Sequence, residues 1–363
     1  MTNEMTLTTV HSTRLTSEQV DESAVSLIEA SLQGRSEERE KGPERPDENH
    51  GASRTNLKEE TLMERLRRQF HIENQLFREI LAEFFCTAFL LFWGDSTVAQ
   101  FVISRRQTDE WTSLAISWGV GLWLAVQMAI RISGAHLNPA VSFFLFTQKK
   151  ISFAKFLIFS IVQIAGGFVG ALGVFVMYYE GISDYDQGVR QVTGPMATAG
   201  IFSTYPKPYL TVVGGMIDQI FGTVMLCMGV ATIVDKRNGI PQFLQPGCIG
   251  FLLVGIGMAF GHNSGYAINP ARDLGPRLFT LCAGYGWEVF SYRDYRWFWI
   301  PIVGPMIGAV IGAWLYEFLI GFHLPDLPQI EPETAAKRKS GMDFSKRDEQ
   351  VVSHNPTTDV TQP

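Results

Sequence analysis

The sequence predicts an all-α integral membrane protein in which six transmembrane helices and two re-entrant half-helices form an inverted 3+3 repeat. Three features support this prediction: six long apolar stretches, two similar short motifs between them, and polar segments at both ends. About 20 mainly apolar residues suffice for a helix to cross the hydrocarbon core of a bilayer. The apolar stretches lie at about residues 76–103, 112–131, 152–179, 211–234, 246–262 and 297–320.

Two motifs that read almost alike predict two further, shorter helices. The first is Ser133-Gly134-Ala135-His136-Leu137-Asn138-Pro139-Ala140, and the second is Ser264-Gly265-Tyr266-Ala267-Ile268-Asn269-Pro270-Ala271-Arg272. Asparagine is a favoured N-cap and proline is favoured at the first helical position, so each helix is expected to begin at its proline. The first is expected to end at Lys149-Lys150 and the second before Gly284.

Each of these helices is too short to cross a membrane. A helix of about 11 residues is roughly 16 Å long, which is about half of a hydrocarbon core of roughly 30 Å. A helix start at this depth is tolerated only where protein surrounds it or where it lines a water-filled cavity. The paired motifs therefore predict a pore or a binding site inside the membrane.

The two motifs belong to an internal repeat. Asn138 and Asn269 are 269 − 138 = 131 residues apart, and the two copies of the repeat cover about 76–179 and 211–320. Because three spans, an odd number, separate equivalent points, the second copy must enter the membrane upside down. The two half-helices then approach from opposite sides, with their N-termini near the midplane.

The polar ends of the chain set the expected domain boundaries. Of 363 residues, 46% are apolar and 18% are charged, and the two ends are polar throughout. We expect disordered tails at 1–70 and 325–363 around a channel domain at 71–324. Apolar residues and arginines at 57–70 indicate either a basic helix on a membrane surface or an ordinary solvated lead-in. Basic residues near the spans favour a cytoplasmic position for both tails.

Composition argues against several other functions. The net charge of −6 is near neutrality for this length and gives no sign of nucleic-acid binding. The four cysteines lack the spacing of a metal site or a disulfide framework and are expected to be small buried apolar residues: Cys86, Cys227, Cys248 and Cys282. No nucleophile, base or metal-ligand set converges, so we expect neither an enzyme nor a cofactor or metal.

With its six spans and paired Ser-Gly…Asn-Pro-Ala motifs, the chain resembles the aquaporin or major intrinsic protein family over about residues 76–324. Two details resemble the aquaglyceroporin branch: Asp273 after the second motif, and the stretch Gly-Ile-Phe-Ser-Thr-Tyr-Pro at 200–206. The resemblance implies a passive channel for glycerol, water and other small neutral solutes such as urea, closed to protons and ions. It also implies a homotetramer with one pore per chain, in the plasma membrane.

The resemblance places the selectivity constriction of the family on Trp118, Gly257, Tyr266 and Arg272. In water-selective members a histidine usually stands at the position of Gly257, so glycine implies room for a wider solute. The two aromatic rings would form an apolar corner, and the arginine would offer donors to hydroxyl groups. The expected slot is therefore amphipathic, which suits a polyol.

The motif asparagines are expected to govern ion exclusion. Asn138 and Asn269 would each hold the start of their own helix through the side-chain oxygen and leave the amide N–H₂ group as a donor toward the lumen. The positive ends of the two half-helices would repel cations. Donors fixed on one wall would interrupt a proton wire.

Four further residues are expected to support the pore. Glu83 and Gln219 occupy equivalent points of the first and fourth spans, where the family often has two glutamates, and Gln219 still has groups that bridge to loop backbone. His136 fits either the pore wall or a neutral packing role, and Asp273 fits a structural role. An ion pair between Arg272 and Asp273 is an alternative to a pore-facing arginine.

Two other functions remain open for the same fold. A water-dominated pore is one, and Gly257 argues against it. A weakly conducting junctional or scaffold protein is the other, and the intact Asn138, Asn269 and Arg272 argue against it.

Overall fold

The computed structural model describes residues 60–327, and within this range every regular element is a helix. Each predicted span corresponds to one long helix of the described chain: α3 (Gln75–Ile103), α4 (Trp111–Ala129), α6 (Phe153–Tyr185), α7 (Val212–Val234), α8 (Gln245–Phe260) and α11 (Ile300–Leu319). The two half-helices are α5 (Pro139–Thr147) and α9 (Pro270–Thr280), and each begins at the expected proline. The all-α membrane fold with an inverted repeat is therefore confirmed.

The helix lengths differ from the apolar stretches at some ends. α6 continues six residues past Tyr179, because the charge of Glu180 ends an apolar run without ending a helix. α8 has only 16 residues, about 24 Å at 1.5 Å per residue, and is shorter than a hydrocarbon core. Four helices of the described chain are long and apolar enough to span a membrane by themselves: α4, α6, α7 and α11 with the turn that follows it.

Glycine stripes hold the long helices together in pairs. A Cβ on Gly166 or Gly170 of α6 would lie 2.4 or 2.5 Å from a carbonyl oxygen of α3. A Cβ on Gly308 or Gly312 of α11 would lie 2.4 or 2.5 Å from a carbonyl oxygen of α7. Only hydrogen fits at such close approaches, so these glycines allow the paired helices to pack tightly.

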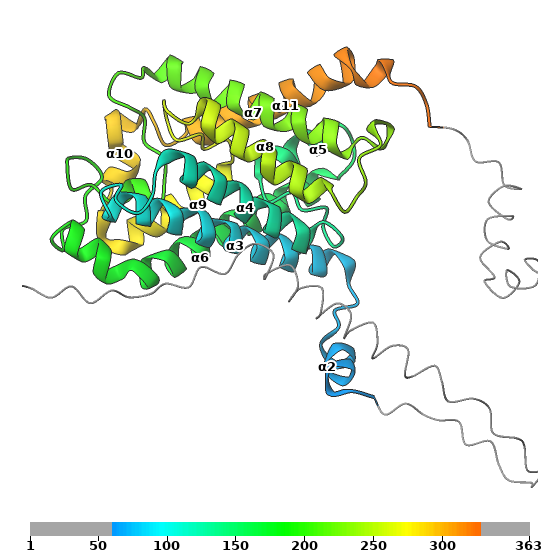
Figure 1. Cartoon of the computed structure of the whole chain (residues 1–363), viewed down its shortest axis with the longest axis horizontal. Coiled ribbons are helices and arrows are strands. Elements are labelled where there is room, and N and C mark those ends of the chain that lie inside the picture. Colours follow the sequence, from blue (N-terminus) through cyan, green and yellow to red (C-terminus); the bar gives the residue numbers. More distant parts are fainter. Residues whose placement is uncertain (1–59, 328–363) are drawn as a thin grey trace, which may run out of the picture. The chain divides into compact units, whose positions relative to one another are not determined.

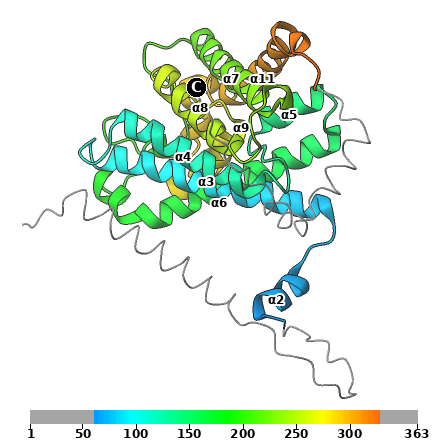
Figure 2. The ribbon, with the colours of Figure 1, turned by 45° about the vertical axis from the view of Figure 1, so that its right-hand side comes forward.

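The two repeats use these pairs in the same way. Figure 1 shows α3 beside α6 along one side of the bundle and α7 beside α11 along the other, and Figure 2 shows the same pairs after rotation. α4 packs against α8 between them, and each half-helix packs against the third span of the other repeat, α9 on α6 and α5 on α11. The half-helices thus tie the two repeats into one body.

Some described residues lie outside this pattern. Residues 62–70 of the expected N-terminal tail form helix α2 (Leu62–Phe70), started by reciprocal hydrogen bonds between Thr61 and Glu64. Helix α10 (Glu288–Tyr295) follows α9 and was not expected from the sequence. Cys86 and Cys227 are buried as expected, but Cys282 is exposed because it lies in the turn after α9. The remaining parts of both predicted tails, 1–59 and 328–363, lie outside the described residues.

Candidate functional site: a cavity at the start of both half-helices

Each motif asparagine caps its own half-helix. The Asn138 Oδ1 atom accepts a hydrogen bond from the backbone N–H of Ala140 at 2.9 Å. The Asn269 Oδ1 atom accepts from the N–H groups of Ala271 at 2.9 Å and Arg272 at 3.3 Å. With Pro139 and Pro270 at the first helical positions, both starts have the geometry that the sequence predicts.

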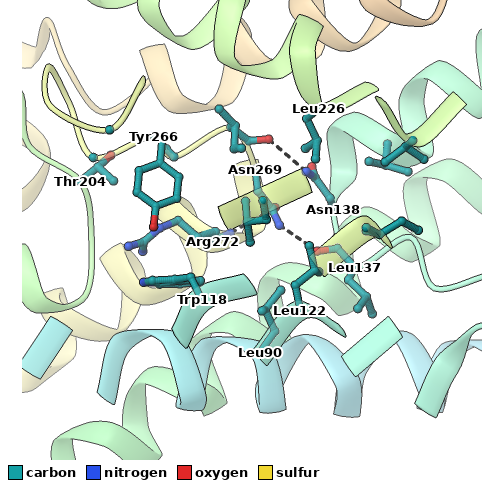
Figure 3. Close-up of a pocket in the computed structure, with 18 of the residues that line it drawn as sticks. Leu90, Trp118, Leu122, Leu137, Asn138, Thr204, Leu226, Tyr266, Asn269 and Arg272 are labelled. Atoms are coloured by element: carbon teal, nitrogen blue, oxygen red, sulfur yellow. Dashed lines mark hydrogen bonds between the residues drawn. The ribbon is translucent and has the colours of Figure 1, made fainter. Parts of the chain in front are cut away.

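The same asparagines bind the two motifs to each other. Asn138 Nδ2 donates to the carbonyl oxygen of Ile268 at 3.0 Å, and Asn269 Nδ2 donates to that of Leu137 at 2.9 Å. Each acceptor is the residue before the opposite asparagine, so the contact is reciprocal (Figure 3). One hydrogen of each amide group is used in this way, and one remains for the lumen.

The backbone before each asparagine is left-handed at equivalent positions. In the first motif φ is 88° at Gly134, 55° at Ala135 and 51° at Leu137. In the second motif it is 81°, 39° and 41° at the residues 131 positions further on, Gly265, Tyr266 and Ile268. Non-glycine residues in this region cost about 1–3 kcal/mol each and need support from their surroundings.

Glu83 supplies that support for the first motif. The side chain is fully buried in α3 and accepts hydrogen bonds from the backbone N–H groups of His136 at 2.9 Å and Leu137 at 2.7 Å. It also accepts from Ser133 Oγ at 2.5 Å and from Gln163 Nε2 at 2.8 Å. Gln163 of α6 was not found from the sequence, and its only signal is an amide within an apolar stretch.

Gln219 supports the backbone of the second motif in the same way. Its Oε1 atom accepts from the N–H of Ile268 at 2.9 Å, and its Nε2 atom donates to Ser264 Oγ at 2.8 Å. Ser264 in turn donates to Asp218 Oδ2 at 2.5 Å. An amide thus bridges the loop where the family often has a glutamate, and the neighbouring Asp218 provides the carboxylate.

A cavity of about 530 Å³ runs along both motifs. It is lined by residues of both loops, by the two asparagines, and by apolar residues of α4, α7 and α8 such as Leu122, Leu226 and Leu253. The wall therefore combines polar groups of the two motifs with apolar side chains of the spans (Figure 3). His136 lies on the wall as well, with its Nδ1 atom 2.9 Å from Ser142 Oγ and its ring against Phe159.

Three of the four predicted constriction residues line this cavity. Trp118, Tyr266 and Arg272 come together in Figure 3, from α4, the second motif and the start of α9. Gly257 of α8 is not among the lining residues and lies behind Tyr266: a Cβ built on it would be 3.0 Å from the Tyr266 ring. Trp111 fixes this arrangement, since its Nε1 atom donates to the Gly257 carbonyl at 3.0 Å and its ring contacts Tyr266 edge-on.

Arg272 has three contacts that hold its guanidinium at the cavity wall. Its Nη1 atom donates to the carbonyl oxygen of Phe202 at 2.7 Å and lies 3.3 Å from Asp95 Oδ1. The guanidinium carbon lies 4.7 Å from the centre of the Trp118 ring, within the range of a cation–π contact. Phe202 belongs to the 200–206 stretch that the sequence singled out.

Asp273 pairs with a different arginine. Its Oδ1 atom accepts from Arg277 Nε at 2.8 Å, and its Oδ2 atom accepts from the N–H and the hydroxyl of Thr204 at 2.9 and 2.5 Å. The alternative of an Arg272–Asp273 ion pair is therefore wrong, because Asp273 faces the loop at 203–204. Asp273 has the structural role expected for it.

Asp95, the buried carboxylate beside Arg272, was not predicted from the sequence. Asp95 is one of three acidic residues in the first apolar stretch, after Glu79 and Glu83, and an ionisable residue at such a position is itself a sign of a functional contact. Thr204 was also missed as a wall residue, although its stretch was noted.

The fold and the cavity define a multi-pass membrane channel in which two half-helices meet inside a helical bundle. Residues 71–316 match the family model described as major intrinsic protein. The chain is 42% identical to mouse aquaporin-9 over 73% of its own length and 90% of that protein. It is 39% identical to human aquaporin-10, over 71% of this chain and 86% of that protein.

A solved structure gives the same result. The aquaglyceroporin from Plasmodium falciparum matches with a TM-score of 0.61 and 30% identity, covering 68% of this chain and 97% of that chain. This protein belongs to the major intrinsic protein family. It is thus a channel and not an enzyme, and the resemblance carried by its two motifs is confirmed.

Proposed function

We propose that this protein is a passive channel that conducts glycerol and water through the 530 Å³ cavity and excludes ions and protons. One observation carries the proposal: the rings of Trp118 and Tyr266 and the guanidinium of Arg272 border the same cavity (Figure 3). An apolar edge beside fixed N–H donors suits a solute with a carbon backbone and hydroxyl groups. The match to an aquaglyceroporin of known structure supports this choice.

The two half-helix starts provide a physical basis for ion exclusion. α5 and α9 begin where Asn138 and Asn269 donate to the carbonyl oxygens of Ile268 and Leu137 in the opposite motif, so both positive helix ends face the same region of the cavity. The remaining hydrogen of each amide is a donor that orients a passing hydroxyl or water. The positive electrostatic potential of the two helix ends repels cations. Water molecules that turn their oxygens toward the asparagine amides cannot donate a hydrogen bond in that direction, so the hydrogen-bonded chain of waters is interrupted.

Other solutes and functions follow from the same site. Urea is a small neutral molecule with an amide-like polar edge, and we include it among the proposed solutes. A water-dominated pore fits less well, because the absence of a side chain at Gly257 lets the Tyr266 ring lie against α8 and not further into the cavity. A scaffold with little conduction fits less well than a channel, because the cavity runs past both motifs.

We extend the proposal to the assembly and its place in the cell. Large apolar side chains on outward helix faces, such as Ile161 at 66% and Phe251 at 78% exposure, suit contact with lipid or with neighbouring subunits. We propose a homotetramer with one pore per chain, in the plasma membrane, with both termini in the cytoplasm and with a channel domain at 71–324.

Swelling of proteoliposomes that contain the purified full chain tests the proposed function. In a glycerol gradient, vesicles should shrink and then swell again as glycerol enters, and water flux should exceed that of empty vesicles. Water flux without glycerol flux would favour the water-dominated pore. Protein shown to be folded and inserted, yet silent to both solutes, would favour the scaffold.

A further inference from the structure

A buried carboxylate lies directly behind the arginine of the predicted constriction. Asp95 of α3 has no exposed surface, and its Oδ1 atom lies 3.3 Å from Arg272 Nη1. Neither of its carboxylate oxygens has a hydrogen-bond partner among the described residues. An ionised carboxylate in such a place is strongly unfavourable unless an opposite charge is close, and Arg272 is the one cationic group within 4.0 Å in residues 60–327.

The other buried ion pair of the region shows what a structural pair looks like in this protein. Asp273 and Arg277 are both fully buried, and each Asp273 oxygen accepts a hydrogen bond from Arg277 or Thr204. The Asp273 carboxylate would keep its hydrogen bonds from Thr204 even if its interaction with Arg277 were lost. Asp95 has no such donors, so its stabilisation depends on the charge of Arg272 alone.

The backbone of α3 is shaped to bring Asp95 to this position. Gly94 lies against Trp118, and a Cβ on Gly94 would be 2.4 Å from atoms of the indole ring. The glycine therefore lets Trp118 lie flat on α3, with Arg272 stacked over the ring at 4.7 Å. One turn of α3 thus supports both the aromatic edge and the polar edge of the predicted constriction.

We propose that Asp95 is a positioning and charge-compensating residue for Arg272. Its carboxylate holds the guanidinium against α3 and offsets its charge, so that the wall presents N–H donors to a hydroxyl without a net positive charge. The exclusion of cations then depends mainly on the half-helix starts. This inference rests on the proposed function, because it takes the wall at Arg272 as part of the path of the solute.

Removing the arginine exposes the effect of the carboxylate. Proteoliposomes with the full chain are compared for wild type, Arg272→Val, and Arg272→Val combined with Asp95→Asn, with K⁺ flux and glycerol swelling measured on each. Valine is much shorter than arginine, so in Arg272→Val water of the cavity reaches Asp95 and hydrates its carboxylate. The hydrated negative charge at the wall should then attract cations. Adding the isosteric, uncharged Asn should lower K⁺ flux by about threefold or more, because it removes the negative charge that raises the local concentration of cations.

The matched control is Ser96→Ala in the Arg272→Val background, which changes the next residue of α3 and should leave K⁺ flux as it was. Equal K⁺ flux in Arg272→Val with and without Asp95→Asn would overturn the inference, since a carboxylate that only fills space has no such effect. K⁺ flux in Arg272→Val no greater than in wild type would also overturn it. If the double variant does not fold, as judged by gel filtration, Asp95→Ala takes the place of Asp95→Asn.

Wild-type behaviour separates this inference from the proposed function. A wild-type channel silent to both glycerol and water would contradict the proposed function itself. A wild-type channel that conducts glycerol, with no effect of Asp95 on K⁺ flux in the arginine variant, would contradict only the role of Asp95.

Discussion

At Gly257 the absence of a side chain leaves room for the ring of Tyr266. A Cβ there would lie 3.0 Å from the ring, 3.1 Å from its hydroxyl oxygen and 3.2 Å from the Cβ of Ala115. All three distances are shorter than ordinary van der Waals contacts, so a side chain at 257 must displace its neighbours. Gly257 therefore acts on the cavity through the position of Tyr266, which does line it.

Gly257→His should lower glycerol permeability by roughly tenfold and water permeability by less. The imidazole would push the Tyr266 ring toward the lumen, and a reduced cross-section excludes the wider solute first. Stopped-flow light scattering on proteoliposomes measures both rates. Gly257→Ala adds only a Cβ and should lower both permeabilities less, again with glycerol affected more than water. An equal decrease in glycerol and water permeability would contradict this role of Gly257.

At the scale of elements, the distance between packed helices determines which glycines are needed for stability. On α11, a Cβ at Gly308 would lie 2.4 Å from the carbonyl oxygen of Ile220, which is part of the α7 backbone and cannot turn aside. On α8, Gly255 has no heavy atom within 4 Å of a built Cβ. The two positions carry the same residue in apolar helices, but only the first is at a close helix–helix contact.

Gly308→Ala should destabilise the protein by about 1–3 kcal/mol, because the added methyl group forces α7 and α11 apart. Gly255→Ala is the matched control and should be neutral or stabilising by up to about 1 kcal/mol, the gain in helix propensity. Thermal unfolding of both variants in the same detergent measures the difference. Equal unfolding temperatures for the two variants would contradict this prediction, because the close approach of α7 and α11 at Gly308 would then have no effect on stability.

At the scale of the whole molecule, two equivalent loops are held by different chemistry. Glu83 accepts four hydrogen bonds around the first motif, whereas Gln219 accepts one and donates one around the second. The reason lies beside them: Ser264 already donates to Asp218, so a second carboxylate at 219 would face the first. Each repeat therefore has one carboxylate near its motif, at different positions.

Glu83→Gln and Gln219→Glu should both destabilise the fold although each mimics the opposite repeat. Glu83→Gln replaces one carboxylate oxygen, which accepts two of the four hydrogen bonds, with an N–H₂ group that faces the same two donors, and it should cost at least about 3 kcal/mol. Gln219→Glu removes the donor to Ser264 and adds a charge next to Asp218. Both variants should unfold at a lower temperature than wild type in the same detergent. A Gln219→Glu variant as stable as wild type would contradict the inference that Asp218 disfavours a second carboxylate at position 219.

The sequence alone determined the helices, the half-helices and their relation. Apolar length, the Asn-Pro helix starts and the 131-residue offset depend on local chemistry and on counting spans, so they are visible without coordinates. The two motif asparagines follow from the same local chemistry, whereas Glu83 and Gln219 were predicted from the family resemblance that the motifs carry.

The tertiary structure decided which side chains meet. Arg272 pairs with Asp95, 177 residues earlier in the chain (272 − 95), rather than with the adjacent Asp273. Gly257 proved to lie behind Tyr266 instead of on the wall, and Gln163 joined the Glu83 cluster from another helix. These contacts depend on how helices distant in sequence are rotated and packed against each other, and no local pattern records that rotation.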